Sequence, residues 1–135
     1  MPFWKTTSSH PSKQRLAQQT APLHVRQRFM GASLSKELKE EYGFGTLRVR
    51  RGDIVKILRG DAKGLEGKVA KVDLTKGRIQ IEGITQKKVD GSNVLIPIHP
   101  SKVQITKLDL TDKLRSAAFE RRKPSEKVKK KEVKK

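Results

Sequence analysis

Glycine recurs between residues 51 and 83 as a break between short apolar segments, and this spacing constrains the fold more than any other feature. The apolar segments 54–58 and 69–72 are separated by a loop that contains Gly60, Gly64 and Gly67. Glycine supplies the positive φ angles and the close backbone approaches that short strands need at their connections. The spacing therefore predicts a small sheet of short strands.

Alternating and continuous apolar runs predict five strands, near residues 53–58, 68–72, 78–82, 94–98 and 103–108. Gly77 and the pair Asp90-Gly91 mark two of the turns between them. Five short strands within about 55 residues are typical of a small, partly open barrel. The predicted fold class is mainly β.

The chain divides by pattern into three segments: a basic N-terminal arm (1–46), the barrel (47–108), and a short helix with a lysine-rich tail (109–135). Residues 1–20 have little apolar content, so we expect no structure there in isolation. Two short helices are predicted in the arm, over 22–30 and over 34–42. For the second, Ser33 is the predicted cap and Gly43 the stop.

The helix after the barrel is predicted to begin with Asp109 or Thr111 as its cap and to end before Pro124. Its apolar face would consist of Leu110, Leu114 and Ala118. The lysine run that follows it is expected to be disordered without a partner.

A net charge of +18, from 32 Lys and Arg against 14 Asp and Glu, calls for an anionic partner. All three segments carry more basic than acidic residues, so the charge is not confined to a tail. Charge of this size opposes a compact state unless a polyanion neutralises it. Membrane binding is the weaker alternative, because no apolar run approaches the roughly 18 residues of a spanning helix. Nucleic acid is the expected partner.

Catalytic chemistry has little support in the sequence. The three histidines are far apart, and cysteine is absent, so no metal-ligand spacing is present. A phosphate-binding P-loop is excluded, because Ala62 and Val69 stand where that motif needs glycine and Ser/Thr. Carboxylates such as Asp53 have basic neighbours and are interpreted as solvated surface groups. We expect no enzyme activity, no metal, no cofactor and no small-molecule substrate.

The aromatic residues all lie outside residues 45–118. Readers of single-stranded nucleic acid stack bases on exposed aromatic rings, and this barrel offers none. Lys and Arg side chains, glycine-loop amides and small polar groups remain, and these suit phosphates and 2′-hydroxyls of folded RNA.

The glycine-spaced segment resembles a KOW motif, which occurs in ribosomal proteins and in transcription elongation factors of the NusG type. Three flanking segments narrow the resemblance: Ala21 to Arg26, Leu34 to Leu38, and Ile98 to Val103. Together they resemble the large-subunit ribosomal protein family numbered 24 in bacteria and 26 in eukaryotes, in its archaeal and eukaryotic branch. The resemblance covers roughly residues 13–122, and the short C-terminal extension favours an archaeal source.

This resemblance implies an SH3-like barrel and a structural role in the large ribosomal subunit. It also implies binding to the 5′ domain of large-subunit rRNA early in assembly, ribosomal proteins near the polypeptide exit tunnel as neighbours, and a cytoplasmic ribosome as location. A KOW-domain elongation factor is the alternative, but the 46 residues before the barrel do not supply the NusG-type domain that it requires.

The expected rRNA contacts are cations, glycine-loop residues and small polar groups. They are Lys13, Arg15, His24, Arg26, Arg28, Lys36, Arg48, Arg50, Arg51, Arg59, Lys63, Gly64, Gly67, Lys68, Lys87, Lys88, Asn93, His99, Ser101 and Lys102.

Overall fold

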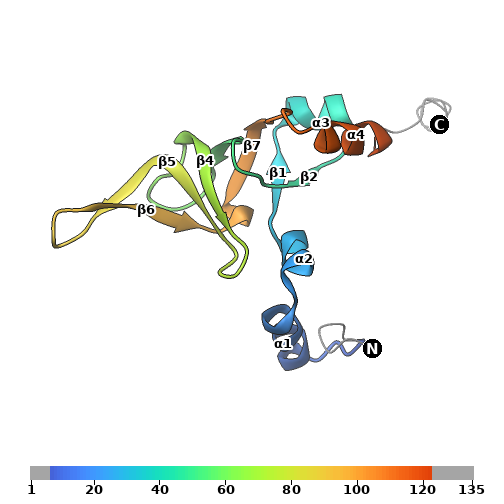
Figure 1. Ribbon diagram of the computed structural model, residues 1–135, viewed down its shortest axis with the longest axis horizontal. Coiled ribbons are helices and arrows are strands. Elements are labelled where there is room, and N and C mark those ends of the chain that lie inside the picture. Colours follow the sequence, from blue (N-terminus) through green and yellow to red (C-terminus); the bar gives the residue numbers. More distant parts are fainter. Residues whose placement is uncertain (1–6, 123–135) are drawn as a thin grey trace.

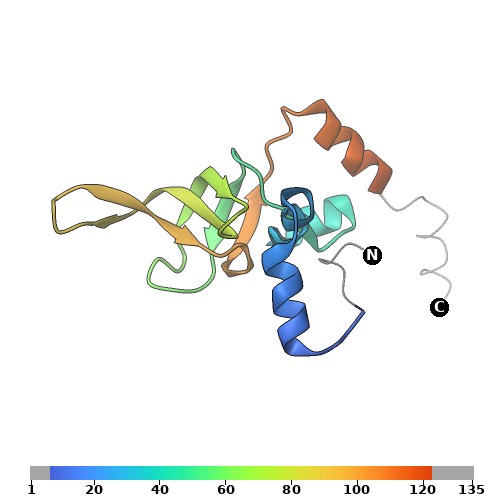
Figure 2. The same cartoon turned by 60° about the horizontal axis from the view of Figure 1, so that its bottom comes forward.

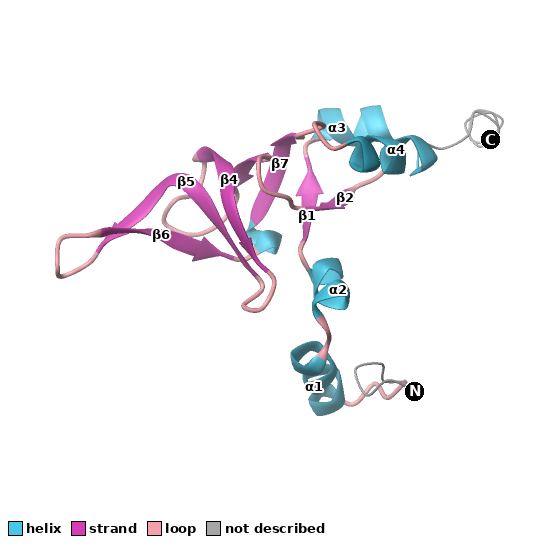
Figure 3. Ribbon diagram, in the orientation of Figure 1, coloured by secondary structure: helices cyan, strands magenta, loops and turns pink. Residues whose placement is uncertain are grey.

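The computed structural model describes residues 7–122, in which one mixed β-sheet carries short helices on its flanks (Figure 1, Figure 3). The strands are β1 (Gly31–Leu34), β2 (Thr46–Arg48), β3 (Ile54–Ile57), β4 (Glu66–Asp73), β5 (Arg78–Lys87), β6 (Asn93–Ile98) and β7 (Val103–Lys107). The helices are α1 (Pro11–Thr20), α2 (Leu23–Arg26), α3 (Lys36–Tyr42) and α4 (Lys113–Arg122), with single 3-10 turns η1 (Gln27–Phe29) and η2 (Pro100–Lys102). The predicted lysine tail lies outside the described residues.

The strand order in the sheet is β2-β1-β7-β3-β4-β5-β6. All five predicted strands are confirmed, as is the mainly β class. The count of five is wrong, because β1 and β2 add two strands at one end. Since β2 and β6 are the outer strands of the order, the sheet stays open and does not close into a barrel.

Strand β1 includes the residues predicted to begin the second helix, and its partners explain the difference. It pairs with β2 in antiparallel fashion and with β7 in parallel fashion, with Ser33 opposite Gln104 and Leu34 opposite Ile105. A four-residue strand has no stability of its own. Its conformation is set by a strand about 70 residues away, which no local pattern reveals.

The helices of the arm also differ from the prediction in their bounds. Ser35, and not Ser33, caps α3, since its Oγ accepts a hydrogen bond from the Leu38 amide at 3.4 Å. Gly43 ends α3 in the left-handed conformation, as predicted. The predicted helix over 22–30 is shorter and divides into α2 and η1. Helix α1 lies where the sequence predicts no structure.

The two predicted turns are present. Gly77 has positive φ in the turn between β4 and β5, where the Asp73 carboxylate accepts from the amides of Thr75 and Lys76 at 3.0 Å. Gly91 has positive φ in the connection between β5 and β6. Figures 1 and 2 show this second hairpin projecting away from the remainder of the molecule.

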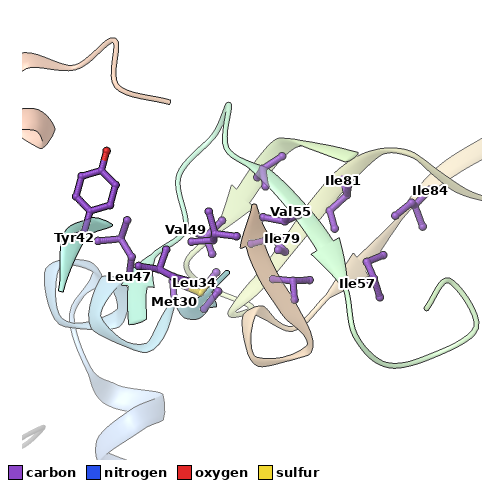
Figure 4. Packing of buried hydrophobic residues seen from close by; sticks show 14 of the residues in the cluster. Met30, Leu34, Tyr42, Leu47, Val49, Val55, Ile57, Ile79, Ile81 and Ile84 are labelled. Carbon is purple, nitrogen blue, oxygen red and sulfur yellow. The ribbon is translucent and has the colours of Figure 1, made fainter. Parts of the chain in front are cut away.

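The core lies along the middle of the sheet, where inward side chains of β1, β3 and β7 meet those of β4 and β5 (Figure 4). Leu34, Val55 and Ile105 are completely buried. Tyr42, Phe44 and Phe119 form an aromatic cluster beside this core, with ring centroids 5.4–5.9 Å apart. These rings pack the end of α3 against α4, so their role is structural.

The prediction that Asp53 is a solvated carboxylate is wrong. Its side chain is fully buried and forms an ion pair with Arg115 of α4, with Oδ1 2.6 Å from Nη1 and Oδ2 2.8 Å from Nη2. The predicted apolar face of α4 is also wrong, because Leu110 and Leu114 are exposed while Arg115 and Phe119 are buried. The Asp112 carboxylate accepts from the Leu114 amide at the start of α4, which replaces the predicted caps.

Elements on both sides of the predicted barrel take part in the same sheet and core. Strand β1 belongs to the predicted arm and α4 to the predicted C-terminal segment, and each contributes buried residues to the cluster. The division at residues 46 and 108 therefore stays a prediction, and fragments can test it.

Candidate RNA interface

The predicted rRNA-binding residues lie almost entirely on the surface. Within residues 7–122 only Arg26, Gly67 and His99 among them are partly buried, and all the others are exposed. In this part of the chain three pairs join a Lys or Arg to a carboxylate: Arg50–Asp112, Lys56–Glu66 and Arg115–Asp53. Most of the surface cations therefore keep their full charge for an external anion.

Four basic side chains gather around one recess of about 430 Å³ at the end of the sheet, which we call the β3–β4 recess. They are Arg59, Arg78, His99 and Lys102, set around a floor that includes Ile57 and Ile98. The Leu58 amide donates to the Lys102 carbonyl at 2.9 Å, which holds the β3–β4 loop against η2. The glycine loop after β3 and the η2 turn thus form one surface.

Sequence reasoning missed Arg78 in this recess. The side chain follows the Gly77 turn and alternates with buried Ile79, so the alternation marks it as outward-facing. Alternation along one strand does not reveal that β5 and η2 both contribute to this recess.

His99 is fixed in the wall of this recess by the turn it begins. Its Nδ1 accepts from the Ser101 amide at 3.2 Å and lies 2.7 Å from the Ser101 hydroxyl. Burial, followed by the nearby charges of Arg78 and Lys102, lowers the pKa of His99 below 6.5. Because Nδ1 is the acceptor, the proton of the neutral ring lies on Nε2, and His99 offers a neutral donor.

The glycine loop presents fewer free amides to an anion than the sequence predicts. The amides of Lys63, Gly64 and Leu65 donate to the carbonyls of Gly60, Ile57 and Ala62 at 2.8–3.2 Å. These groups close the loop and are not free for a phosphate. The exposed charges of Arg59 and Lys63 remain available.

Gly64 and Gly67 have different roles. Gly64 has a φ of +91°, with open space where a Cβ would lie. Gly67 lies inside β4, where a Cβ would come within 2.6 Å of Ile81 Cγ2 and 2.7 Å of the Glu82 carbonyl oxygen. Only Gly64 belongs to the loop, and Gly67 permits close contact between β4 and β5.

Arg26 is already engaged within the protein. Its guanidinium donates to the carbonyls of Ala21 and Thr75, both at 2.8 Å, and to that of Gln19. The contact with Thr75 ties the arm to the β4–β5 turn. No carboxylate in residues 7–122 pairs with it, so its charge is fixed in place and uncompensated.

A second basic surface surrounds a depression beside β2, which includes Arg48, Arg50 and Arg51. Arg50 also forms an exposed ion pair with Asp112. Its charge is therefore partly satisfied, while the other two arginines are not paired with any carboxylate in the described part of the chain.

The remaining predicted residues are spread over the molecule. Lys87, Lys88 and Asn93 lie at the far end of the β5–β6 hairpin, and Lys68 lies near Asp109, whose pKa it helps to lower after the hydrogen bonds from Thr111. The others follow the N-terminal elements, and they are Lys13, Arg15, His24, Arg28 and Lys36. The predicted set is therefore an extended surface and not one site.

Metal and membrane chemistry gain no support from the described residues. Across 7–122, no three His, Asp or Glu side chains gather in a way that could hold a metal ion. In the same range, no helix has the length and apolarity needed to cross a bilayer.

Two kinds of comparison, with a protein family as a whole and with individual proteins, point to the same family. Residues 8–122 match the family of ribosomal proteins described as L26 in eukaryotes and L24 in archaea. The chain is 52% identical over 123 residues to the large ribosomal subunit protein uL24 of Pyrobaculum islandicum, covering 91% of this chain and 98% of the relative. It is 52% identical over 114 residues to the protein of the same name from Methanosarcina barkeri, covering 84% and 98%. The chain belongs to this family of large-subunit ribosomal proteins.

Proposed function

We propose that the chain is a structural component of the large ribosomal subunit that binds large-subunit rRNA mainly through phosphate contacts. The observation that carries this proposal is family membership over nearly the whole described chain, combined with an exposed and largely unpaired set of cations. Relatives named large ribosomal subunit protein uL24 support the ribosomal role. Such a role needs no catalytic group.

The finer placement rests on the family resemblance. The proposed RNA partner is the 5′ domain of large-subunit rRNA, bound early in assembly. The proposed protein neighbours are large-subunit proteins near the polypeptide exit tunnel, within a cytoplasmic ribosome.

In mechanism, the charged surface replaces the counterions that surround the RNA phosphates. Each Lys or Arg that neutralises a phosphate releases counterions, which supplies affinity and makes binding sensitive to salt. The β3–β4 recess brings Arg59, Arg78 and Lys102 together around an apolar floor. The surface beside β2 and the basic arm would engage other backbone segments of the same RNA.

Co-sedimentation tests the proposal against its alternative. We expect the full chain to sediment at one copy per large subunit in a sucrose gradient and to stay bound at moderate salt. Sedimentation with RNA polymerase and not with the subunit would favour an elongation factor. The family match does not support that second function.

A further inference from the structure

A groove lies between the N-terminal arm and the β4–β5 turn, and His99 is the lining residue that it shares with the β3–β4 recess. It encloses about 530 Å³ and is lined by residues that include Gln18, Gln19, Arg26, Phe29, Lys76 and His99. The lining residues come from α1, the end of α2, η1, the turn after β4, and the residue that precedes η2. Figures 1 and 2 show the β4–β5 turn beside α2. Unlike the recess, this basic surface contains an exposed aromatic ring.

Phe29 is the ring in question, and it is 47% exposed. The ring–ring contacts of residues 7–122 join Tyr42, Phe44 and Phe119 to one another and do not include Phe29. Nearly half of this residue is therefore accessible to a ligand in the groove. Phe29 precedes the predicted barrel in the sequence, but the fold of the arm brings it to a groove that it shares with the β4–β5 turn.

The Arg26 guanidinium and the backbone of the turn that carries Lys76 are positioned in advance. The three carbonyls that accept from Arg26 hold its guanidinium beside η1 without neutralising it. The turn that carries Lys76 is held by the Asp73 carboxylate, which accepts from the Thr75 and Lys76 amides. A binding group that is already held loses little conformational entropy when a ligand arrives.

The polar groups of the groove suit a nucleobase. Glutamine amides present both donors and acceptors, the combination that pairs with base edges. Both Gln18 and Gln19 are exposed side chains in the last turns of α1. His99 adds a neutral donor through Nε2, because its Nδ1 is occupied by Ser101.

We propose that this groove binds one unpaired nucleotide of the RNA, with its base stacked on Phe29 and its phosphate near Arg26 and Lys76. The proposal rests on the RNA-binding function above and names a subsite within it. Bases in a duplex are stacked on each other, so only a nucleotide from a loop, a bulge or a strand end could reach the ring. An apolar side chain of a protein neighbour could not pair with the two cations or with the two glutamine amides of the groove.

The first experiment is ultraviolet crosslinking of the full chain bound to large-subunit rRNA, followed by mass spectrometry of the digested protein. We expect a nucleotide adduct on the tryptic peptide that begins at Phe29, after cleavage at Arg28. This readout uses the unmodified protein, so it holds even where a variant folds poorly. An adduct-free peptide, or a protein-to-protein link at Phe29 in the assembled subunit, would overturn the proposal.

The second experiment measures rRNA affinity by filter binding for Phe29→Ala, Phe29→Tyr and Leu23→Ala. Stacking of a base on an aromatic ring contributes to the affinity for unpaired nucleotides, so Phe29→Ala should weaken binding by about 5- to 150-fold. Tyrosine keeps the ring and should bind within about twofold of the wild type. Leu23 is a matched control, since it is 56% exposed in the neighbouring helix and does not line the groove.

The outcomes separate this subsite from the broader function. If the wild type binds rRNA and Phe29→Ala binds equally well, the subsite is excluded while the function stands. If the wild type does not bind rRNA at all, the proposed function fails and the subsite fails with it. A loss in Phe29→Ala that Phe29→Tyr restores supports stacking.

Discussion

The Asp53 carboxylate and the Arg115 guanidinium, 62 residues apart in sequence, meet through two parallel hydrogen bonds in the interior. The remaining capacity of Asp53 is filled by the amides of Arg50 at 2.9 Å and Asp109 at 3.0 Å. Arg115 also donates to the Asp109 carbonyl at 2.9 Å. A buried ion pair is tolerated when all its groups are satisfied in this way, and it fixes α4 to the start of β3.

Arg115→Met should destabilise the protein strongly. The substitution leaves the Asp53 carboxylate buried with only backbone amides as donors, and removing one partner of a buried pair costs about 3–5 kcal/mol. We expect thermal denaturation to show a melting temperature lower by about 10 °C or more.

The matched control is Arg50→Met, which removes the partner of Asp112 in an exposed ion pair. Exposed pairs contribute about 0–1 kcal/mol, so its melting temperature should change little. Equal effects of the two substitutions would contradict the structural role assigned to the buried pair.

Gly64 and Gly67 should respond differently to asparagine. At Gly64 the strain comes from φ, costing roughly 1–2 kcal/mol for alanine, and asparagine tolerates this region better. At Gly67 the obstacle is the Glu82 carbonyl, so asparagine should be at least as harmful as alanine. Denaturant unfolding of Gly64→Ala, Gly64→Asn, Gly67→Ala and Gly67→Asn measures the four free energies of unfolding. If asparagine is less destabilising than alanine by the same amount at both positions, the two glycines do not have the different roles assigned here.

Single cations of the β3–β4 recess should contribute to the salt dependence of rRNA binding. Lys102→Ala and Arg59→Ala should each reduce the slope of log K against log salt by about one, with unchanged melting. Lys56→Ala is the control, because Glu66 lies 3.6 Å from its Nζ and already compensates its charge. Unchanged slopes for both recess variants would exclude the recess as a phosphate contact.

His99 should make stability depend on pH below neutrality. Its pKa is lowered in the folded protein, so between that lowered value and about 6.5 the unfolded chain binds more protons. Stability should therefore be complete above pH 6.5 and decrease as the pH falls through this window. Melting of His99→Gln compared with wild type at about pH 5 and about pH 7.5 tests this, and His10→Gln is the control. An undiminished pH effect in His99→Gln would assign it to other groups.

Fragments can test where the folded unit begins and ends. Residues 21–122 keep β1, the aromatic cluster and the Asp53–Arg115 pair, whereas residues 47–108 lose all three. We expect the longer fragment to melt cooperatively near the full chain and the shorter one to be less stable. If the shorter fragment melts equally well, the division at 46 and 108 is the correct one.

The sequence located the strands whose signal is local. β5 and β7 alternate apolar and polar residues over several positions, and Gly77 and Gly91 mark turns that depend on their own φ angles. The same reasoning identified most of the exposed cations, since charged side chains stay in water unless they are paired. Sequence reasoning wrongly assigned Asp53 to the surface, because its partner Arg115 is 62 residues away and no local pattern connects the two.

Composition and local pattern by themselves determined that this chain is basic and mainly β, and they predicted an anionic polymer as its partner. Only the tertiary structure decided that β1 is a strand, that Asp53 is buried against Arg115, and that Phe29 faces a groove shared with His99. The physical reason is the range of the interactions. Turn geometry, alternation and charge act over a few residues, whereas sheet pairing, ion-pair burial and groove formation depend on groups that the fold alone brings together.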